Sequence, residues 1–164
     1  MIEIVPYEPV HQDGVVSVIL PIQREEFGVP ITLEAQPDLL DIPGFYQQGS
    51  GNFWVALDES EVVGTISLLD IGNGQAALRK MFVKAAYRGK EHGVAQRLMN
   101  ELVAWSGAHD VREVFLGTTS FFLAAHRFYE KNGFDEIRKD ELPPTFHFMP
   151  VDSKFYRLGI QSVS

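Results

Sequence analysis

One segment constrains this chain more than any other: LRKMFVKAAYRGKEHGVAQRLMNELVAW, residues 78–105. It opens with a mostly apolar run at 78–83, and a basic turn with glycines follows at 87–93. Apolar residues then recur at helical spacing, at Val94, Leu98, Leu102 and Trp105. That spacing of i, i+4, i+8 and i+11 predicts a helix with one buried face. We therefore expect a strand, a glycine-containing turn and a long amphipathic helix in direct succession.

A strand, a glycine turn and a helix start in this order can bind an anion. Amide groups at a helix N-terminus lack intrahelical acceptors and carry partial positive charge, and glycines let a phosphate approach the main chain. Arg88 and Lys90 flank Gly89, and Gly93 precedes the helix. The alternative is a solvated turn that only joins two elements. The two cations favour phosphate, although the segment has neither a P-loop ending nor a Gly-x-Gly-x-x-Gly motif.

The turn resembles the acetyl-CoA signature of the GNAT superfamily of N-acetyltransferases, whose pyrophosphate loop reads (Gln/Arg)-x-x-Gly-x-(Gly/Ala). Lys90-Glu91-His92-Gly93-Val94-Ala95 fits its last positions, with lysine in place of Gln or Arg. Alternatively, Arg88 takes the first position and the turn is two residues longer. A second block, AAHRFYEKNGF at 124–134, is similar to the later helix and turn of the superfamily. The resemblance implies an α+β fold over a single domain, 1–164, with a central, mostly antiparallel twisted sheet flanked by helices.

The resemblance also implies acetyl-CoA as co-substrate. Its pyrophosphate would meet the turn, and its pantetheine arm would pair with the main chain of the preceding strand, where one N–H would polarise the acetyl carbonyl. The residues assigned to the cofactor are Met81, Phe82, Val83, Arg88, Gly89, Lys90, Glu91, His92, Gly93, Val94 and Ala95. In many relatives an asparagine of the later helix touches the arm. Phe122 takes that place here, so we expect this hydrogen bond to be missing.

Acetyl transfer to an amine requires a neutral amine, a polarised carbonyl and a proton for the leaving thiolate. A phenol, with an unperturbed pKa of roughly 10, carries its proton at neutral pH. The resemblance assigns this acid role to Tyr129, with packing beside Phe128 as the alternative. His126, three residues earlier on the helix, would orient the phenol or relay a proton, or is a polar surface residue. The base is unassigned: the strand that carries a glutamate in many members reads AALRK, and Glu25 and Glu26 are weak candidates.

Alternation and spacing predict the remaining elements. Strands are expected at 2–7, 53–57, 61–69, 113–117, 134–138 and 153–159. Helical spacing at 10–27 contains Pro21, which predicts a kink or a break, and a short helix is expected near 37–48. In the superfamily this early helical region walls the acceptor site. Ser120 is expected to cap a later helix that ends at Gly133.

Composition narrows the classes of function. The absence of cysteine excludes disulfides and thiolate chemistry, and we expect no metal site. The net charge of −8 argues against nucleic acid and is compatible with an amine partner, or simply with solubility. No stretch approaches the roughly 20 apolar residues of a membrane span, so no membrane partner is expected. No signal peptide is recognisable in MIEIVPYEP, so a cytoplasmic location is expected.

The leading interpretation is an acetyl-CoA-dependent N-acetyltransferase, an acyltransferase that acts on a primary amine of a small molecule or protein. The amine would attack directly, with Tyr129 as general acid. A non-catalytic acyl-CoA-binding or sensing domain on the same fold is the alternative, because the usual glutamate is missing. A nucleotide-phosphate binder that uses only the turn is a third hypothesis. The acceptor amine is unidentified, and the resemblance allows a homodimer.

Overall fold

The structure, a computed structural model, describes residues 1–89, 91–120 and 123–161. Over these ranges the chain forms one seven-stranded sheet in the order β1-β2-β3-β4-β5-β7-β6. The strands are β1 (Ile2–Pro6), β2 (Asn52–Asp58), β3 (Glu61–Gly72), β4 (Gln75–Val83), β5 (Glu113–Thr118), β6 (Asp135–Ile137) and β7 (Lys154–Gly159). Each neighbouring pair is antiparallel except β4 and β5. The mostly antiparallel sheet of the predicted fold is thereby confirmed.

The first four strands form an antiparallel meander, which includes the three consecutive strands predicted before the turn. β1 lies at the edge, and Pro6 at its end pairs with Trp54. An edge position suits proline, which has no N–H for a ladder. The β3–β4 hairpin extends beyond the predicted strands at 61–69 and 78–83, to the pair of Gly72 and Gln75. It closes at Asn73 and Gly74, both with positive φ (58° and 72°). Two successive left-handed residues match the right-handed twist of the strands they join.

β4 contains a bulge near its carboxyl end. Thr65 of β3 lies opposite Phe82 and Ser67 lies opposite Arg79, so β4 has one residue more than β3 between these pairs. Lys80 has a φ of 53°, which is uncommon for a residue other than glycine. The Thr65 and Ser67 hydroxyls donate to the carbonyls of Lys80 and Arg79, each at 2.7 Å. These bonds hold the bulge, and a bulge changes the direction in which side chains point.

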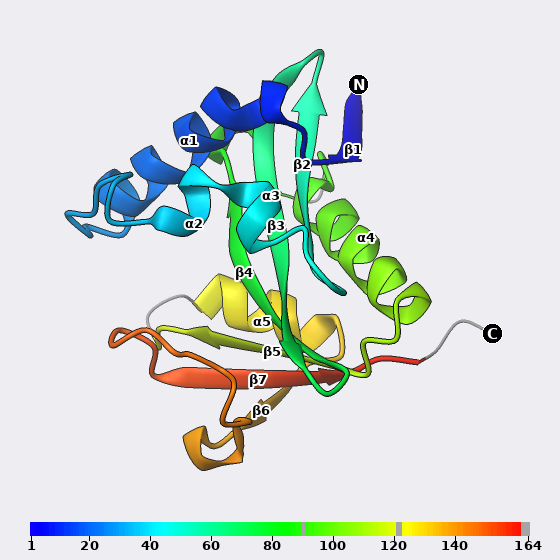
Figure 1. The fold of residues 1–164 in the computed structure, drawn as a ribbon. Helices are drawn as coiled ribbons and strands as arrows, with labels where there is room; N and C mark the ends of the chain where they lie inside the picture. Colours follow the sequence, from blue (N-terminus) through cyan, green and yellow to red (C-terminus); the bar gives the residue numbers. More distant parts are fainter. Residues whose placement is uncertain (90, 121–122, 162–164) are drawn as a thin grey trace.

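The sheet divides between β4 and β5. These strands pair at three positions, where residues 75–77 lie opposite residues 113–115. From Leu78 onward β4 pairs with β3 alone, as far as the described residues show. Figure 1 shows β5, β7 and β6 running across the direction of β2, β3 and β4. The main chain of β4 therefore has an open edge along residues 78–83, which is where the cofactor arm was predicted to bind.

Helices cover both faces of the sheet (Figure 1). The helical segments are η1 (Pro9–His11), α1 (Gln12–Pro21), η2 (Ile22–Glu26), α2 (Pro37–Leu40), α3 (Ile42–Phe45), η3 (Ala85–Tyr87), α4 (Val94–Ala108), α5 (Leu123–Lys131) and η4 (Lys139–Glu141). α4 and α5 pack on one apolar cluster, which contains Leu98, Val114 and Tyr156. α1 to α3 pack on a second cluster, which contains Ile19 and Tyr46. No helix among the described residues is long and apolar enough to cross a membrane.

The early helical region differs from its prediction in two details. Of the kink or break expected at Pro21, the break does not occur: Pro21 ends α1, and the chain continues directly as the π-helical segment η2. The helix expected near 37–48 is two single turns, α2 and α3. Asp41 separates them with a φ of −143°, and its Oδ1 accepts a hydrogen bond from the Gly44 amide at 3.0 Å.

α5 ends as predicted, at a glycine. Gly133 has a φ of 91°, and the amide of Phe134 donates to the carbonyl of Tyr129 at 3.1 Å. This closure satisfies a carbonyl at the end of a helix. Within the described residues the helix spans Leu123–Lys131. Residues 121 and 122 lie outside the described ranges, so the predicted Ser120 cap and the predicted role of position 122 stay predictions.

Candidate active site

The predicted phosphate turn leads from β4 into α4. Gly89 and Gly93 have positive φ values of 106° and 62°, a conformation that favours glycine. Gly93 is the N-cap of α4 and has no side chain to cap the first amides of the helix. Glu91 and His92 are exposed beside it. Lys90 lies outside the described residues, so its contact with the phosphates stays a prediction. The helix start thus presents backbone donors to an anion.

Arg88, the other predicted phosphate ligand, has partners within the protein. Its Nε donates to the carbonyl of Val83 at 2.8 Å. Its Nη1 and Nη2 lie 2.7 and 2.9 Å from the two carboxylate oxygens of Glu26. This fork-to-fork pair ties η2 to the turn. It also lowers the pKa of the Glu26 carboxyl, chiefly through the hydrogen bond from Arg88. A carboxylate with a lowered pKa is a poor base, which argues against Glu26 in that role.

Several predicted residues meet beneath α4 and α5. Met81 of β4, Ala95 of α4 and Tyr129 of α5 pack against the same apolar cluster. Val94, at the start of α4, is buried in it. Phe82 faces the other side of the sheet, where its ring centroid is 6.0 Å from that of Phe27. One side of the sheet therefore carries Met81 of the open β4 edge, the first turn of α4 and the predicted acid, Tyr129.

Tyr129 lies in an aromatic setting. Its ring centroid is 5.8 Å from that of Phe134, 5.9 Å from that of Tyr156 and 6.0 Å from that of Phe128. Burial raises the pKa of Tyr129 to about 12. Its hydroxyl has no hydrogen-bond partner among the residues that the structure describes. The phenol therefore keeps its proton at neutral pH and has no acceptor within the described protein.

His126 is a buried residue and not a polar surface residue. Its side chain is 5% exposed, and its Nε2 donates to the carbonyl of Thr119 at 2.7 Å. This bond connects α5 to the segment that follows β5. No hydrogen bond joins His126 to Tyr129 within the described ranges. The surface alternative is therefore wrong, and the proton relay stays a prediction.

Two residues that sequence reasoning missed connect α4 to α5. Gln96 Nε2 donates to Asn132 Oδ1 at 2.7 Å, and Asn132 Nδ2 is 3.3 Å from Gln96 Oε1. Asn132 also donates to the carbonyl of Phe128 at 2.9 Å. Gln96 directly follows the first signature block, and Asn132 lies within the second. Their positions were the one feature of the sequence that could have drawn attention to them. A contact across 36 positions, however, depends on how the two helices pack.

A second polar group on the α1–α3 side was also missed. Lys80 Nζ donates to Gln36 Oε1 at 2.6 Å and lies 3.6 Å from Asp38 Oδ2. The hydroxyl of Tyr46 donates to the same Asp38 oxygen at 2.6 Å. Loss of solvation lowers the pKa of Lys80, against the opposing effect of Asp38. These bonds fix the β4 bulge against α2 and α3.

The run of β4 expected to carry a base, AALRK at 76–80, has no carboxylate. Ala77 in this run is buried in a third cluster with Phe115, Phe146 and Phe155. The described residues contain no group of three or more His, Asp or Glu side chains placed to hold a metal ion. A strand carboxylate at this point of β4 is therefore not available to take the amine proton.

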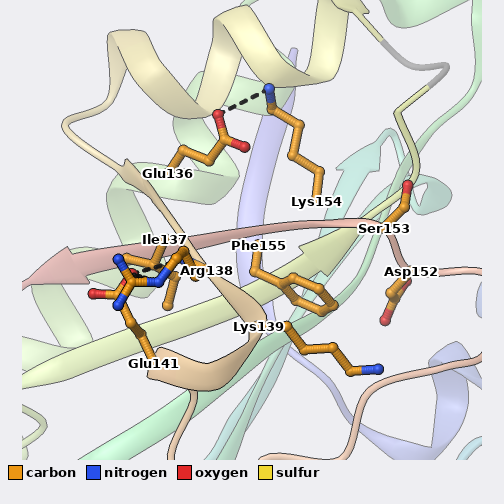
Figure 2. Close-up of a pocket in the computed structure, with 9 residues that line it drawn as sticks. All are labelled: Glu136, Ile137, Arg138, Lys139, Glu141, Asp152, Ser153, Lys154 and Phe155. Carbon is orange, nitrogen blue, oxygen red and sulfur yellow. Dashed lines mark hydrogen bonds and ion pairs between the residues drawn. The ribbon is translucent and has the colours of Figure 1, made fainter.

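A hollow of about 550 Å³ adjoins the third cluster, against β6, β7 and η4 (Figure 2). It is lined by Glu136, Ile137, Arg138, Lys139, Glu141, Asp152, Ser153, Lys154 and Phe155. Glu136 pairs with Lys154 at 3.1 Å, and the ammonium of Lys139 lies 4.0 Å from the centre of the Phe148 ring. None of the residues predicted for catalysis or cofactor binding lines this hollow.

Comparisons with known proteins agree with this geometry. The model of the acetyltransferase (GNAT) family matches residues 17–134. N-acetylaspartate synthetase of Danio rerio is 30% identical over 125 residues, which are 74% of this chain and 44% of that protein. The chain thus spans less than half the length of this relative.

Solved structures share the fold. A GNAT-family acetyltransferase from Staphylococcus aureus Mu50 is 33% identical, with a TM-score of 0.91 over 98% of this chain and 100% of that one. The PaiA N-acetyltransferase of Thermoplasma acidophilum, solved with coenzyme A, has a TM-score of 0.73 at 17% identity over 97% of this chain and 99% of that one. At such an identity the likeness concerns the fold alone.

Proposed function

Because this chain belongs to the acetyltransferase (GNAT) family, we propose that it transfers an acetyl group from acetyl-CoA to a primary amine. The observation that carries the proposal is the open edge of β4 beside the uncapped start of α4. An amide-bearing pantetheine arm pairs with an exposed strand edge, and a pyrophosphate suits the amides at a helix start. Both features occur along one continuous stretch of chain, from Leu78 to Val94.

The residues support a direct attack. The amine nitrogen bonds to the thioester carbonyl carbon, and an amide N–H near Met81 stabilises the negative oxygen that forms. The carbon–sulfur bond then breaks, and Tyr129 donates its proton to the departing thiolate. The amine gives up its own proton to water, since residues 76–80 of β4 carry no carboxylate and Glu26 is paired with Arg88. The products are the acetylated amine and coenzyme A.

Small amines are the first acceptors to test. The relative from Danio rerio is named for the synthesis of N-acetylaspartate, an acetylated amino acid. In this chain the acceptor would approach from the α1–α3 side of the sheet, opposite α4 and α5. On that side α2 and α3 are short turns, and Phe27, Leu40 and Phe45 are exposed large apolar residues.

Two measurements test the proposed function. Calorimetry with acetyl-CoA reports binding, and a colorimetric thiol assay with a panel of amines reports transfer. We expect saturable binding and thiol release that depends on the amine. Binding without thiol release from any amine would support the non-catalytic acyl-CoA-binding alternative. The absence of binding would contradict both.

A further inference from the structure

The β4 bulge places two successive cations on one face of the sheet. Leu78 and Met81 pack beneath α4, whereas Phe82 packs on the α1–α3 side. Regular alternation would put Arg79 and Lys80 on opposite faces. The extra residue instead leaves Arg79 opposite Ser67 and turns Lys80 toward Gln36 and Asp38. Both cations therefore face the side from which an acceptor would approach.

Among the described residues, Lys80 has hydrogen-bonded and ion-paired partners, whereas the side chain of Arg79 has none. Lys80 has the carboxylate of Asp38 and the amide oxygen of Gln36. The guanidinium of Arg79, which is partly buried, makes no hydrogen bond and no ion pair with any residue that the structure describes. Partly buried charges in proteins normally have a counter-ion. A guanidinium presents a planar fork of donors that matches a carboxylate bidentately.

An acidic residue faces Arg79 from the other half of the sheet. Asp152 precedes β7, and its Oδ2 accepts a hydrogen bond from the Met149 amide at 2.9 Å. A Cβ on Gly117 of β5 would stand 2.7 Å from the same oxygen, so the glycine makes room for this carboxylate. Burial raises the pKa of Asp152, and the charge of Arg79 acts in the opposite direction. One cation and one anion thus stand on the two sides of the gap between β4 and β5.

We propose that the acceptor carries a carboxylate beside its amine, and that Arg79 binds this carboxylate while Asp152 accepts a hydrogen bond from the amine nitrogen. The acceptor class is then the free amino acids and related small amino acids. Their two groups match the two charges across the gap, and the hollow beside Asp152 leaves room for a side chain (Figure 2). This inference rests on the proposed acetyl transfer for its chemistry, but the binding site itself can be tested without turnover.

The turnover test compares aspartate, leucine, phenylalanine and lysine, each with its α-carboxamide. An α-carboxamide makes the neighbouring amine less basic, so intrinsic reactivity at neutral pH favours the amide of each pair. We expect the protein to prefer at least one acid over its amide by roughly 10- to 100-fold in kcat/KM, the range for a hydrogen bond to a charged group. Arg79→Gln should abolish that preference through KM, and Arg79→Lys should restore part of it.

The matched control is Arg112→Gln. Arg112 is exposed and donates to the carbonyl of Asn73, at the opposite end of β4 from the bulge. The Arg112→Gln variant should prefer the acid over its amide to the same extent as the parent protein does. Acetyl-CoA affinity and melting temperature should be unchanged in Arg79→Gln, which separates acceptor binding from folding and from cofactor binding.

A binding test completes the design. Calorimetry of the preferred acid, or of all four acids if none reacts, is carried out on the parent and on Arg79→Gln, each saturated with coenzyme A. Binding that Arg79→Gln weakens by 10-fold or more supports the site, even if no thiol is released and the proposed function is wrong. Equal use of acids and amides by the parent would overturn the inference and leave acetyl transfer standing. An acid preference that Arg79→Gln leaves unchanged would also overturn the inference. The absence of acid binding to the parent protein would overturn it as well.

Discussion

At the scale of single residues, the surroundings of Tyr129 decide what it can do. Aromatic rings surround the phenol, burial raises its pKa to about 12, and no hydrogen bond within the described protein occupies its hydroxyl. Removing that hydroxyl therefore leaves no partner unsatisfied. A change from Tyr to Phe at this position should affect proton transfer and leave packing almost intact.

We expect Tyr129→Phe to bind acetyl-CoA with the parent affinity and to lose turnover by ~10²-fold or more, as for loss of a general acid. Steady-state kinetics with saturating acetyl-CoA measure the loss, and calorimetry measures the affinity. Equal turnover in the two proteins would return Tyr129 to a packing role. His126→Ala, in the same assay, should cost less turnover but lower the melting temperature, because it removes the bond to Thr119.

The pH profile gives an independent check on the acid. Tyr129 is in its required, protonated form below its pKa of about 12. Turnover should therefore not fall through this residue as the pH rises to ~10, while the fraction of neutral amine increases. A decline of kcat near pH 8 that disappears in Tyr129→Phe would show that the phenol ionises far earlier than its burial implies.

The sequence identified residues best where one residue type performs one task. Gly93 and Gly133 were predicted as turn glycines, and their positive φ values bear this out. Arg79 was read only as part of a strand that lacks a glutamate. Its direction depends on the β4 bulge, which arises from the register of two strands and leaves no local signal. The pairing of Arg88 with Glu26 also escaped, since the two residues are 62 positions apart.

At the scale of elements, the start of α4 is the feature to test. Gly93 is left-handed with φ of 62°, a conformation that asparagine and aspartate tolerate better than other side chains. Gly93→Asn and Gly93→Asp therefore differ mainly in charge. We expect Gly93→Asp to weaken acetyl-CoA binding well beyond Gly93→Asn, because a carboxylate would repel the pyrophosphate.

Calorimetry on both Gly93 variants, with circular dichroism to confirm the fold, measures the difference. Equal affinities in the two folded variants would mean that the pyrophosphate binds elsewhere. At the level of elements, periodicity predicted α4, whereas the second signature block and its closing Gly133 predicted α5. The split of the helix expected near 37–48 into two turns depends on the cap that Asp41 forms, and the sequence does not distinguish a capping aspartate from one inside a helix.

At the scale of the whole molecule, ligand binding should stabilise both halves of the sheet together. β4 and β5 share three residue pairs, and Gln96 and Asn132 join α4 to the end of α5. A cofactor bound between β4 and α5 would add contacts to both halves. At about 100 times its dissociation constant, a ligand stabilises a protein by about 2.7 kcal/mol.

We accordingly expect acetyl-CoA at that concentration to raise the melting temperature by on the order of 5–10 °C. Differential scanning fluorimetry measures the shift, and Gly93→Asp should lose most of it while Gly93→Asn keeps most of it. A shift of the same size in Gly93→Asp would contradict binding at the α4 start.

The division of the sheet also affects the order in which the two halves are synthesised and can fold. β1 to β4 and α4 come from one continuous stretch that ends at Ala108, and β5, α5, β6 and β7 follow it. Neighbouring antiparallel hairpins need only short loop closures, whereas the parallel β4–β5 pairing must wait for α4 to cross over. The residues of the phosphate turn are therefore joined to the chain before Tyr129 and Asp152. The half of the sheet proposed to bind the cofactor is complete in sequence before the residues proposed for proton donation and acceptor binding are added.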